Sequence, residues 1–127
     1  MLASEPTWGI VVGMEEIYEE ATRGLDVPEA TANRVRRLVR DAWNIQITRH
    51  THEVSVEAVP EELIGTLRVI GRFHRMLEAK TFVWAWLTGP YGVVKDVRFV
   101  KTGSNTFGID LGALISGIRD YLTNRSA

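Results

Sequence analysis

Apolar residues recur every three or four positions in two segments near the N-terminus, which predicts two amphipathic helices. The first is expected over residues 10–24, with Gly24 in position to end it. Its polar face is acidic and holds Glu15, Glu16, Glu19 and Glu20. The second is expected from Pro28 to residue 44, because proline suits a first helical turn and an apolar stripe follows it. A short strand over residues 8–12 is an alternative to the start of the first helix.

Beyond the second helix the period of the pattern changes to two, which is typical of half-buried strands. Residues 45–59 alternate in two opposite phases, so we expect a bulge, bend or turn near Arg49–His52. A third helix is predicted to begin at residues 59–62 and to reach residue 77, because a proline and two acidic residues suit a first turn. Two glycines weaken this helix, and a strand over residues 64–76 is the alternative.

The C-terminal part is predicted to hold a hairpin and a final helix. Residues 81–87 lack charge and are rich in β-branched and aromatic side chains, which favours a strand. A turn at residues 89–92 leads to a partner strand over 93–101, and residues 106–109 add a short strand. Asp110 is expected to cap the last helix, in which small residues allow a neighbouring element to approach closely. These small residues are spaced four apart: Gly112 with Ser116, and Ala113 with Gly117.

Together these elements predict one α+β domain over residues 1–127, in the order α-α-β-α-β-β-(β)-α, with a small and mostly antiparallel sheet packed by helices. A chain of 127 residues is long enough to bury one hydrophobic core. Its 45% apolar and 24% charged residues are typical of a globular protein. Because cysteine is absent, disulfides, zinc–thiolate sites and cysteine nucleophiles are excluded.

Targeting signals and membrane segments are not expected in this sequence. The first residues lack the basic region and apolar core of a secretory signal. The longest uncharged stretch, residues 81–94, is interrupted by a Gly-Pro pair and falls short of the roughly 20 apolar residues of a membrane helix. We therefore expect a protein of the cytoplasm or of an assembled particle, with no membrane partner.

The predicted strand over residues 81–87 is apolar on both faces and provides the first candidate site. Alternation places Phe82, Trp84 and Trp86 on one face. A strand that is apolar on both sides must be covered on both sides, by helices, a ligand or a second subunit. Tyr91 follows in the turn, and tryptophan and tyrosine are enriched at binding hot spots. The alternatives are a central strand between helical layers and an aromatic-lined pocket for an apolar small molecule.

The formal net charge of −1 hides an uneven distribution of charge along the chain. Residues 1–33 hold seven acidic residues and one basic residue, whereas residues 34–101 hold twelve basic and seven acidic residues. Opposed patches of this kind pair either within one subunit or between subunits.

Arginines gather on the second and third predicted helices and provide a second group of interface candidates. They are Arg36, Arg37 and Arg40 on the second helix, and Arg68, Arg72 and Arg75 on the third. Arginine is well suited to phosphate contacts. The isoelectric point of 6.3 nevertheless lies far below the value of about 9 that is typical of nucleic-acid-binding domains, which argues against nucleic acid as the partner.

Histidines are the candidates for a metal site. His50 and His52 share one face if they lie on a strand, and His74 is the third imidazole. No acidic metal motif or HExxH sequence accompanies them, so we expect no metal or other cofactor. The sequence also lacks GxSxG, GxxxxGKS/T and a strand-linked GxGxxG, the motifs of common enzyme classes.

The leading hypothesis is therefore a non-enzymatic structural or adaptor protein that acts through self-association or docking in a larger assembly, such as a virion or tail. Its interface candidates are the aromatic strand, the arginine faces and the acidic first helix. A small-molecule-binding protein or enzyme with an aromatic-lined pocket is the first alternative. Nucleic-acid binding through the arginine-rich helices is the second.

Overall fold

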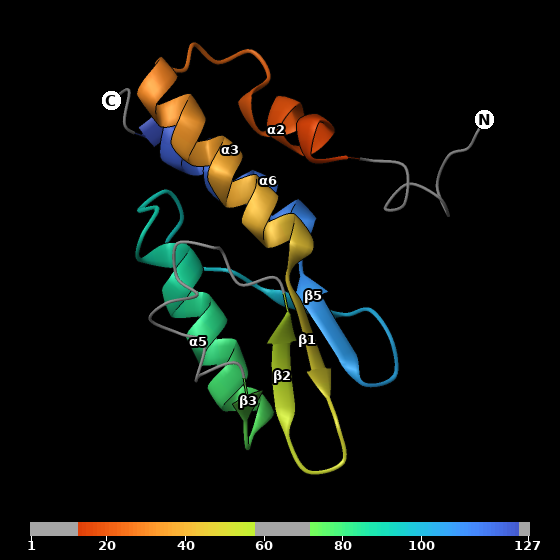
Figure 1. Cartoon of the computed structure of the whole chain (residues 1–127). Coiled ribbons are helices and arrows are strands. Elements are labelled where there is room, and N and C mark those ends of the chain that lie inside the picture. The colour runs from red at the N-terminus through yellow and green to blue at the C-terminus, as the bar shows by residue number, and fades with distance from the viewer. Residues whose placement is uncertain (1–12, 58–71, 125–127) are drawn as a thin grey trace, which may run out of the picture.

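The computed structural model describes residues 13–57 and 72–124, and Figure 1 shows their arrangement. The elements of this part of the chain are α2 (Met14–Thr22), α3 (Glu29–Asn44), β1 (Gln46–Arg49), β2 (Val54–Glu57), β3 (Arg72–Phe73), α5 (Met76–Thr88), β4 (Phe99–Lys101), β5 (Thr106–Ile109) and α6 (Leu111–Asn124). Neighbouring strands are antiparallel, in the order β3-β2-β1-β5-β4. The predicted α+β class and the predicted antiparallel sheet are confirmed.

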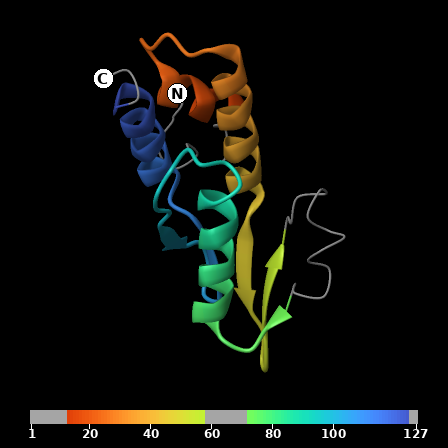
Figure 2. The same ribbon diagram turned by 90° about the vertical axis from the view of Figure 1, so that its left-hand side faces the viewer.

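One face of the sheet is apolar and the other is polar. Ile47 on β1 lies opposite Val56 on β2 and Phe107 on β5, and residues paired in this way project from the same face. Helix α5 packs against β1, β2 and β3, and Figure 2 shows it running alongside these strands. The intervening positions carry polar side chains, such as Thr48 and Ser55, to the opposite face. The apolar alternation in the sequence is therefore what orients the sheet toward α5.

Helices α2, α3 and α6 form a layer beyond one end of the sheet (Figure 1). α2 packs against α3 and α6, with Ile17 and Ala21 buried. Gly24 follows α2 with a φ of 75°, the left-handed conformation predicted at this helix end. Because α3 leads directly into β1 and β5 into α6, one hydrophobic core runs from α2 to the sheet. Residues 10–12 of the first predicted helix lie outside the described residues.

Arg119 of α6 holds the C-terminal end of α2. Its Nη1 donates hydrogen bonds to the backbone carbonyls of Glu20 (3.1 Å) and Arg23 (3.0 Å), at a helix end where carbonyls lack partners within the helix. We expect Arg119→Met to lower the free energy of unfolding by about 1 kcal/mol and to accelerate amide exchange in α2. Urea unfolding and hydrogen exchange measure the two effects, with the exposed Arg37→Met as control. Unchanged exchange in α2 would contradict this role for Arg119.

The strand predicted over residues 81–87 is wrong, because these residues form the larger part of α5. The Glu78 carboxylate accepts a hydrogen bond from the backbone N–H of Arg75 (3.3 Å), which fixes a helix start just before the aromatic run. Packing of this helix on the sheet then overrides the β propensity of the aromatic and β-branched residues. The predicted hairpin with residues 93–101 is wrong for the same reason. Of that segment, Phe99–Lys101 is the strand, and it pairs with β5.

The third predicted helix is corrected over the part that the structure describes. Residues 72–73 form the short strand β3, which pairs with β2. The strand alternative for residues 64–76 is right at this point. Residues 58–71, with Arg68, lie outside the described residues. Arg72 and Arg75 therefore do not share a helical arginine face.

Candidate functional site

Helix α5 exposes apolar side chains that the described part of the chain leaves uncovered. Leu77 is 72% exposed and Trp84 is 42% exposed. Thr81 and Ala85 are also exposed, and helical spacing places them on the same side of the helix. We call these four residues the α5 outer face. A helix that is apolar on nearly all sides is normally buried all round, so this face is a candidate contact surface.

The two ends of the α5 outer face differ in their surroundings. At one end, the Trp84 indole N–H donates a hydrogen bond to Asp96 Oδ1 (3.1 Å), so the ring is held while its surface stays partly exposed. At the other end, a depression of about 470 Å³ lies beside Leu77 and reaches Phe82. The face therefore combines an anchored aromatic ring with a hollow next to an exposed aliphatic side chain.

The inner side of α5 separates the aromatic residues that the strand prediction grouped together. Phe82 packs against Phe73 of β3 with ring centres 5.3 Å apart, and against Trp86 at 6.0 Å. Trp86 is buried, whereas Trp84 faces outward. Because successive helical residues are about 100° apart, Trp84 points away from its neighbours two positions before and after it. The predicted pocket lined by all three aromatic residues is wrong.

Tyr91 is also placed differently from the prediction, which had it at a contact surface. Its side chain is buried, and its hydroxyl donates a hydrogen bond to the buried carboxylate of Asp41 on α3. Asp41 also accepts a hydrogen bond from Arg40 Nε (3.1 Å). Tyr91 therefore fastens the segment after α5 to α3 and has a structural role.

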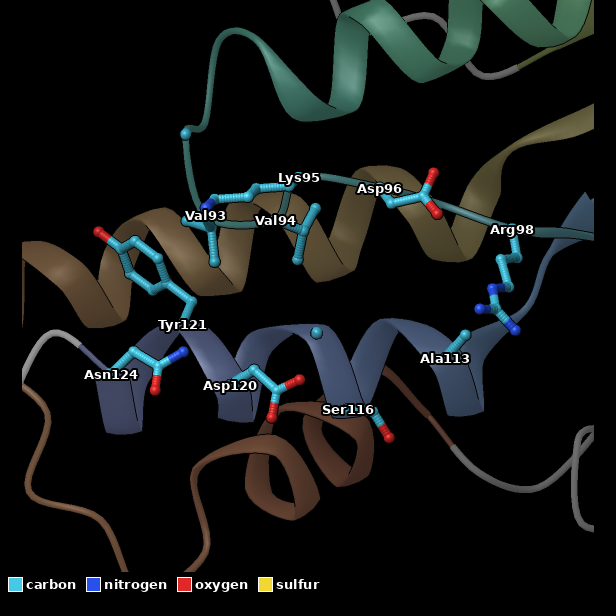
Figure 3. Close-up of a pocket in the computed structure, with 12 residues that line it drawn as sticks. Val93, Val94, Lys95, Asp96, Arg98, Ala113, Ser116, Asp120, Tyr121 and Asn124 are labelled. Atoms are coloured by element: carbon cyan, nitrogen blue, oxygen red, sulfur yellow. The ribbon is translucent and has the colours of Figure 1, made fainter.

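A groove of about 810 Å³ lies between residues 92–98 and α6, and Figure 3 shows its lining. A side chain at Gly117 would begin 3.2 Å from Val94, so the glycine lets this segment approach the helix closely. The close approach predicted from the small residues of the last helix is confirmed at this position. The sequence did not otherwise reveal the groove, because its two walls come from separate parts of the chain.

The acidic side of α2 and the basic side of α3 adjoin. A depression of about 220 Å³ between them is lined by charges of both signs, including Glu15, Arg37 and Arg40. The Arg36 guanidinium lies 4.3 Å from the centre of the Tyr18 ring of α2. Part of the charge asymmetry along the sequence is thus met within one subunit, where Glu15 of α2 lies beside arginines of α3. The asymmetry no longer provides an independent argument for contacts between subunits.

The arginines predicted to act together are divided between distant parts of the molecule. Those of α3 lie in the helical layer, whereas Arg72 and Arg75 lie beside β3 at the far end of the sheet (Figure 1). Arg72 pairs with Glu53 at 3.0 Å, and Arg75 pairs with Glu78 at 3.7 Å. Both pairs are largely exposed and contribute little to stability.

The histidines lie near the sheet end that carries β3. The turn predicted near Arg49–His52 is confirmed, because the backbone N–H of His50 donates to the Glu53 carbonyl (2.7 Å) between β1 and β2. His50 Nε2 also lies 3.1 Å from Ser55 Oγ. Among the described residues, no three His, Cys, Asp or Glu side chains form a group that could hold a metal ion. The three-histidine metal hypothesis therefore gains no support.

Fold and surfaces together define an α+β protein with a five-stranded antiparallel sheet and two candidate contact regions. Comparison with protein-family models, with curated proteins and with solved structures finds no match to this chain. Among the described helices, none has the length and apolar character needed to cross a lipid bilayer.

Proposed function

We propose that this protein is a non-enzymatic structural or adaptor protein that associates with further copies of itself through the α5 outer face. The observation that carries the proposal is the exposure of Leu77 and Trp84 on a helix that is apolar on nearly all sides. Self-association would cover the side of α5 that the described residues leave open. The absence of common catalytic motifs from the sequence agrees with a function based on binding.

Trp84 has the properties of an interface anchor. Tryptophan is enriched at binding hot spots, where a large ring becomes fully buried. The hydrogen bond to Asp96 restricts the ring before any partner arrives, which reduces the entropy lost on association. Leu77 lies two helical turns away and adds an apolar side chain whose burial contributes about 1.5–3 kcal/mol.

A second copy is the occupant that suits this face. A twofold contact places the same patch on both subunits, so a patch with net charge would repel itself. Around Leu77 the charged residues are Arg75 and Glu78, which pair with each other at 3.7 Å. At the Trp84 end, the Asp96 carboxylate is engaged by the indole N–H. Repeated contacts of this type would suit a component of an assembled particle, such as a virion or tail.

The test is sedimentation of the full chain over a wide range of protein and salt concentrations. We expect a concentration-dependent oligomer, and we expect Leu77→Ser to raise its dissociation constant at least tenfold because two copies of the apolar side chain are lost from each contact. Met14→Gln is the matched control, since Met14 is 39% exposed on α2, away from α5. Far-UV circular dichroism establishes that each variant is folded.

Two results would count against this proposal. A wild-type protein that stays monomeric at all concentrations and salt conditions would remove self-association altogether. An oligomer that Leu77→Ser and Met14→Gln weaken equally would place the contact elsewhere on the molecule.

A further inference from the structure

Residues 93–97 cross the molecule as an extended, bent segment outside the sheet. Three of them, Val93, Val94 and Val97, are at most 6% exposed. Yet, within the described ranges 13–57 and 72–124, the backbone N–H and C=O groups of residues 93–97 form no hydrogen bond with other backbone groups. Backbone N–H and C=O groups are strong hydrogen-bonding groups, so a run of them without backbone partners is available to pair with another chain.

The segment lacks backbone partners because of the way the neighbouring strand ends. β5 stops at Ile109, and the chain turns there into α6. The last backbone bond along this edge runs from the Asp110 N–H to the Arg98 carbonyl (2.8 Å). Beyond that bond the segment 93–97 continues without a strand beside it. The position that a neighbouring strand would occupy opens onto the groove beside α6.

Small residues on α6 line this groove, and Gly117 lets Val94 approach the helix closely at one point. Ala113, Ser116 and Gly117 face it, and its volume is about 810 Å³, within the range of natural ligand sites. Figure 3 shows segment 93–98 and α6 as its two walls, with Tyr121 rising from α6 near the Val93 end. A groove with an unpaired extended backbone on one wall matches the requirement for adding a peptide strand.

Charges of both signs line the groove: Lys95, Asp96, Arg98 and Asp120. The Asp96 carboxylate already accepts the hydrogen bond from the Trp84 indole, so Arg98 is the charge that we consider at the Ala113 end. Arg98 is exposed and, within the described part of the chain, forms no ion pair. Its guanidinium reaches toward Ala113 at one end of the groove (Figure 3). An arginine in this setting suits a carboxylate, which it binds through two parallel hydrogen bonds.

We propose that the groove between residues 93–98 and α6 binds an extended peptide segment of a partner protein. The partner's main chain pairs with the backbone of residues 93–97, and an acidic side chain of the partner pairs with Arg98. This site adjoins the α5 outer face through Asp96, but peptide binding in it does not depend on self-association.

Selection of random heptapeptides displayed on phage against the full-length protein provides the probe, and the tightest peptide is then synthesised. We expect it to contain an acidic residue and to slow amide exchange at residues 94–97 at least tenfold. We expect a backbone N-methylated version of the same peptide to bind at least tenfold more weakly, because it cannot donate main-chain hydrogen bonds. Isothermal titration calorimetry measures the affinities.

Variants locate the site and separate it from the proposed function. Arg98→Gln is expected to weaken the peptide at least tenfold, and Ser116→Trp to abolish binding by filling the groove. Lys101→Gln removes a neighbouring exposed cation on β4 and is expected to change nothing. Leu77→Ser is expected to leave peptide binding intact. Circular dichroism confirms that the tryptophan variant is folded.

The proposal is overturned if no heptapeptide is selected, or if the selected peptide leaves the amides of residues 94–97 unprotected. Equal affinity of the N-methylated peptide would also overturn it, because main-chain pairing is then absent. Binding that Leu77→Ser abolishes and Ser116→Trp preserves would assign the peptide to the α5 outer face.

Discussion

Replacing Trp86 with alanine is expected to lower the free energy of unfolding by about 3–5 kcal/mol, whereas Trp84→Ala is expected to cost about 1 kcal/mol. Trp86 is 5% exposed and packs against Phe82. Trp84 is 42% exposed, and its loss removes part of one ring surface and one exposed hydrogen bond to Asp96. On a strand the two tryptophans would share a face and cost similar amounts, so the difference tests the helix directly.

Urea unfolding followed by far-UV circular dichroism measures both variants without depending on indole fluorescence. Trp86→Phe is the control, because it keeps an aromatic ring at the buried site and should lose less than the alanine variant. A domain of this size is stable by about 5–15 kcal/mol, so the Trp86→Ala variant is measured at low temperature, where a folded baseline survives. An equal decrease in the free energy of unfolding for the two alanine variants would contradict the helix and favour the predicted strand.

The helices that were predicted well each have one apolar stripe and one polar face. In α3, for example, the buried side chains of Val35, Leu38 and Ala42 recur at helical spacing among exposed arginines. α5 lacks this contrast, because its exposed side includes Leu77 and Trp84. Hydrophobic periodicity therefore carried no information over residues 81–87, and the β propensity of the side chains led to the wrong element.

The candidate contact surface was predictable from composition but not residue by residue. Residues 81–87 carry more apolar side chains than one face of any element can bury, and this excess does not depend on whether they form a strand or a helix. Which of these side chains remain exposed does depend on whether the segment repeats with the period of a helix or of a strand. The strand period therefore grouped Trp84 with Phe82 and Trp86, and the helix separates them.

Features built from distant parts of the chain left little signal in the sequence. Asp41 and Tyr91 are 50 positions apart, and neither neighbourhood indicates the contact. The groove beside α6 depends on where β5 ends and on unpaired backbone groups, which no side-chain pattern encodes. The spacing of Ala113 and Gly117 indicated a close approach, but it could not indicate which segment approaches.

Asp96 connects the two candidate surfaces. Its carboxylate accepts the hydrogen bond from Trp84, and the same residue lines the groove beside α6. The segment that follows α5 therefore positions the exposed indole on one side and provides a wall of the groove on the other. The anchoring of that segment to the core consequently affects both surfaces.

Tyr91→Phe is expected to lower the free energy of unfolding by about 1.5–3 kcal/mol. The change removes one hydroxyl, and with it a hydrogen bond to the buried Asp41 carboxylate, which is left with one donor fewer. Hydrogen bonds to buried charged groups are worth about this much, because the carboxylate cannot recover the lost bond from bulk water. Since Tyr91 fastens the segment that precedes residues 93–97, amide exchange in that segment should also accelerate.

Tyr18→Phe is the matched control for this prediction. The Tyr18 hydroxyl forms no hydrogen bond with the described residues, and its ring packs beneath Arg36, so removing the hydroxyl should change stability by less than about 0.5 kcal/mol. A double-mutant cycle of Tyr91→Phe with Asp41→Asn isolates the pairwise energy from the separate effects of the two substitutions. Similar small losses for both phenylalanine variants, with no coupling in the cycle, would show that Tyr91 does not anchor the segment. A clear coupling, together with faster amide exchange at residues 93–97 in the Tyr91→Phe variant, would show that the contact between Tyr91 and Asp41 of α3 stabilises this wall of the groove.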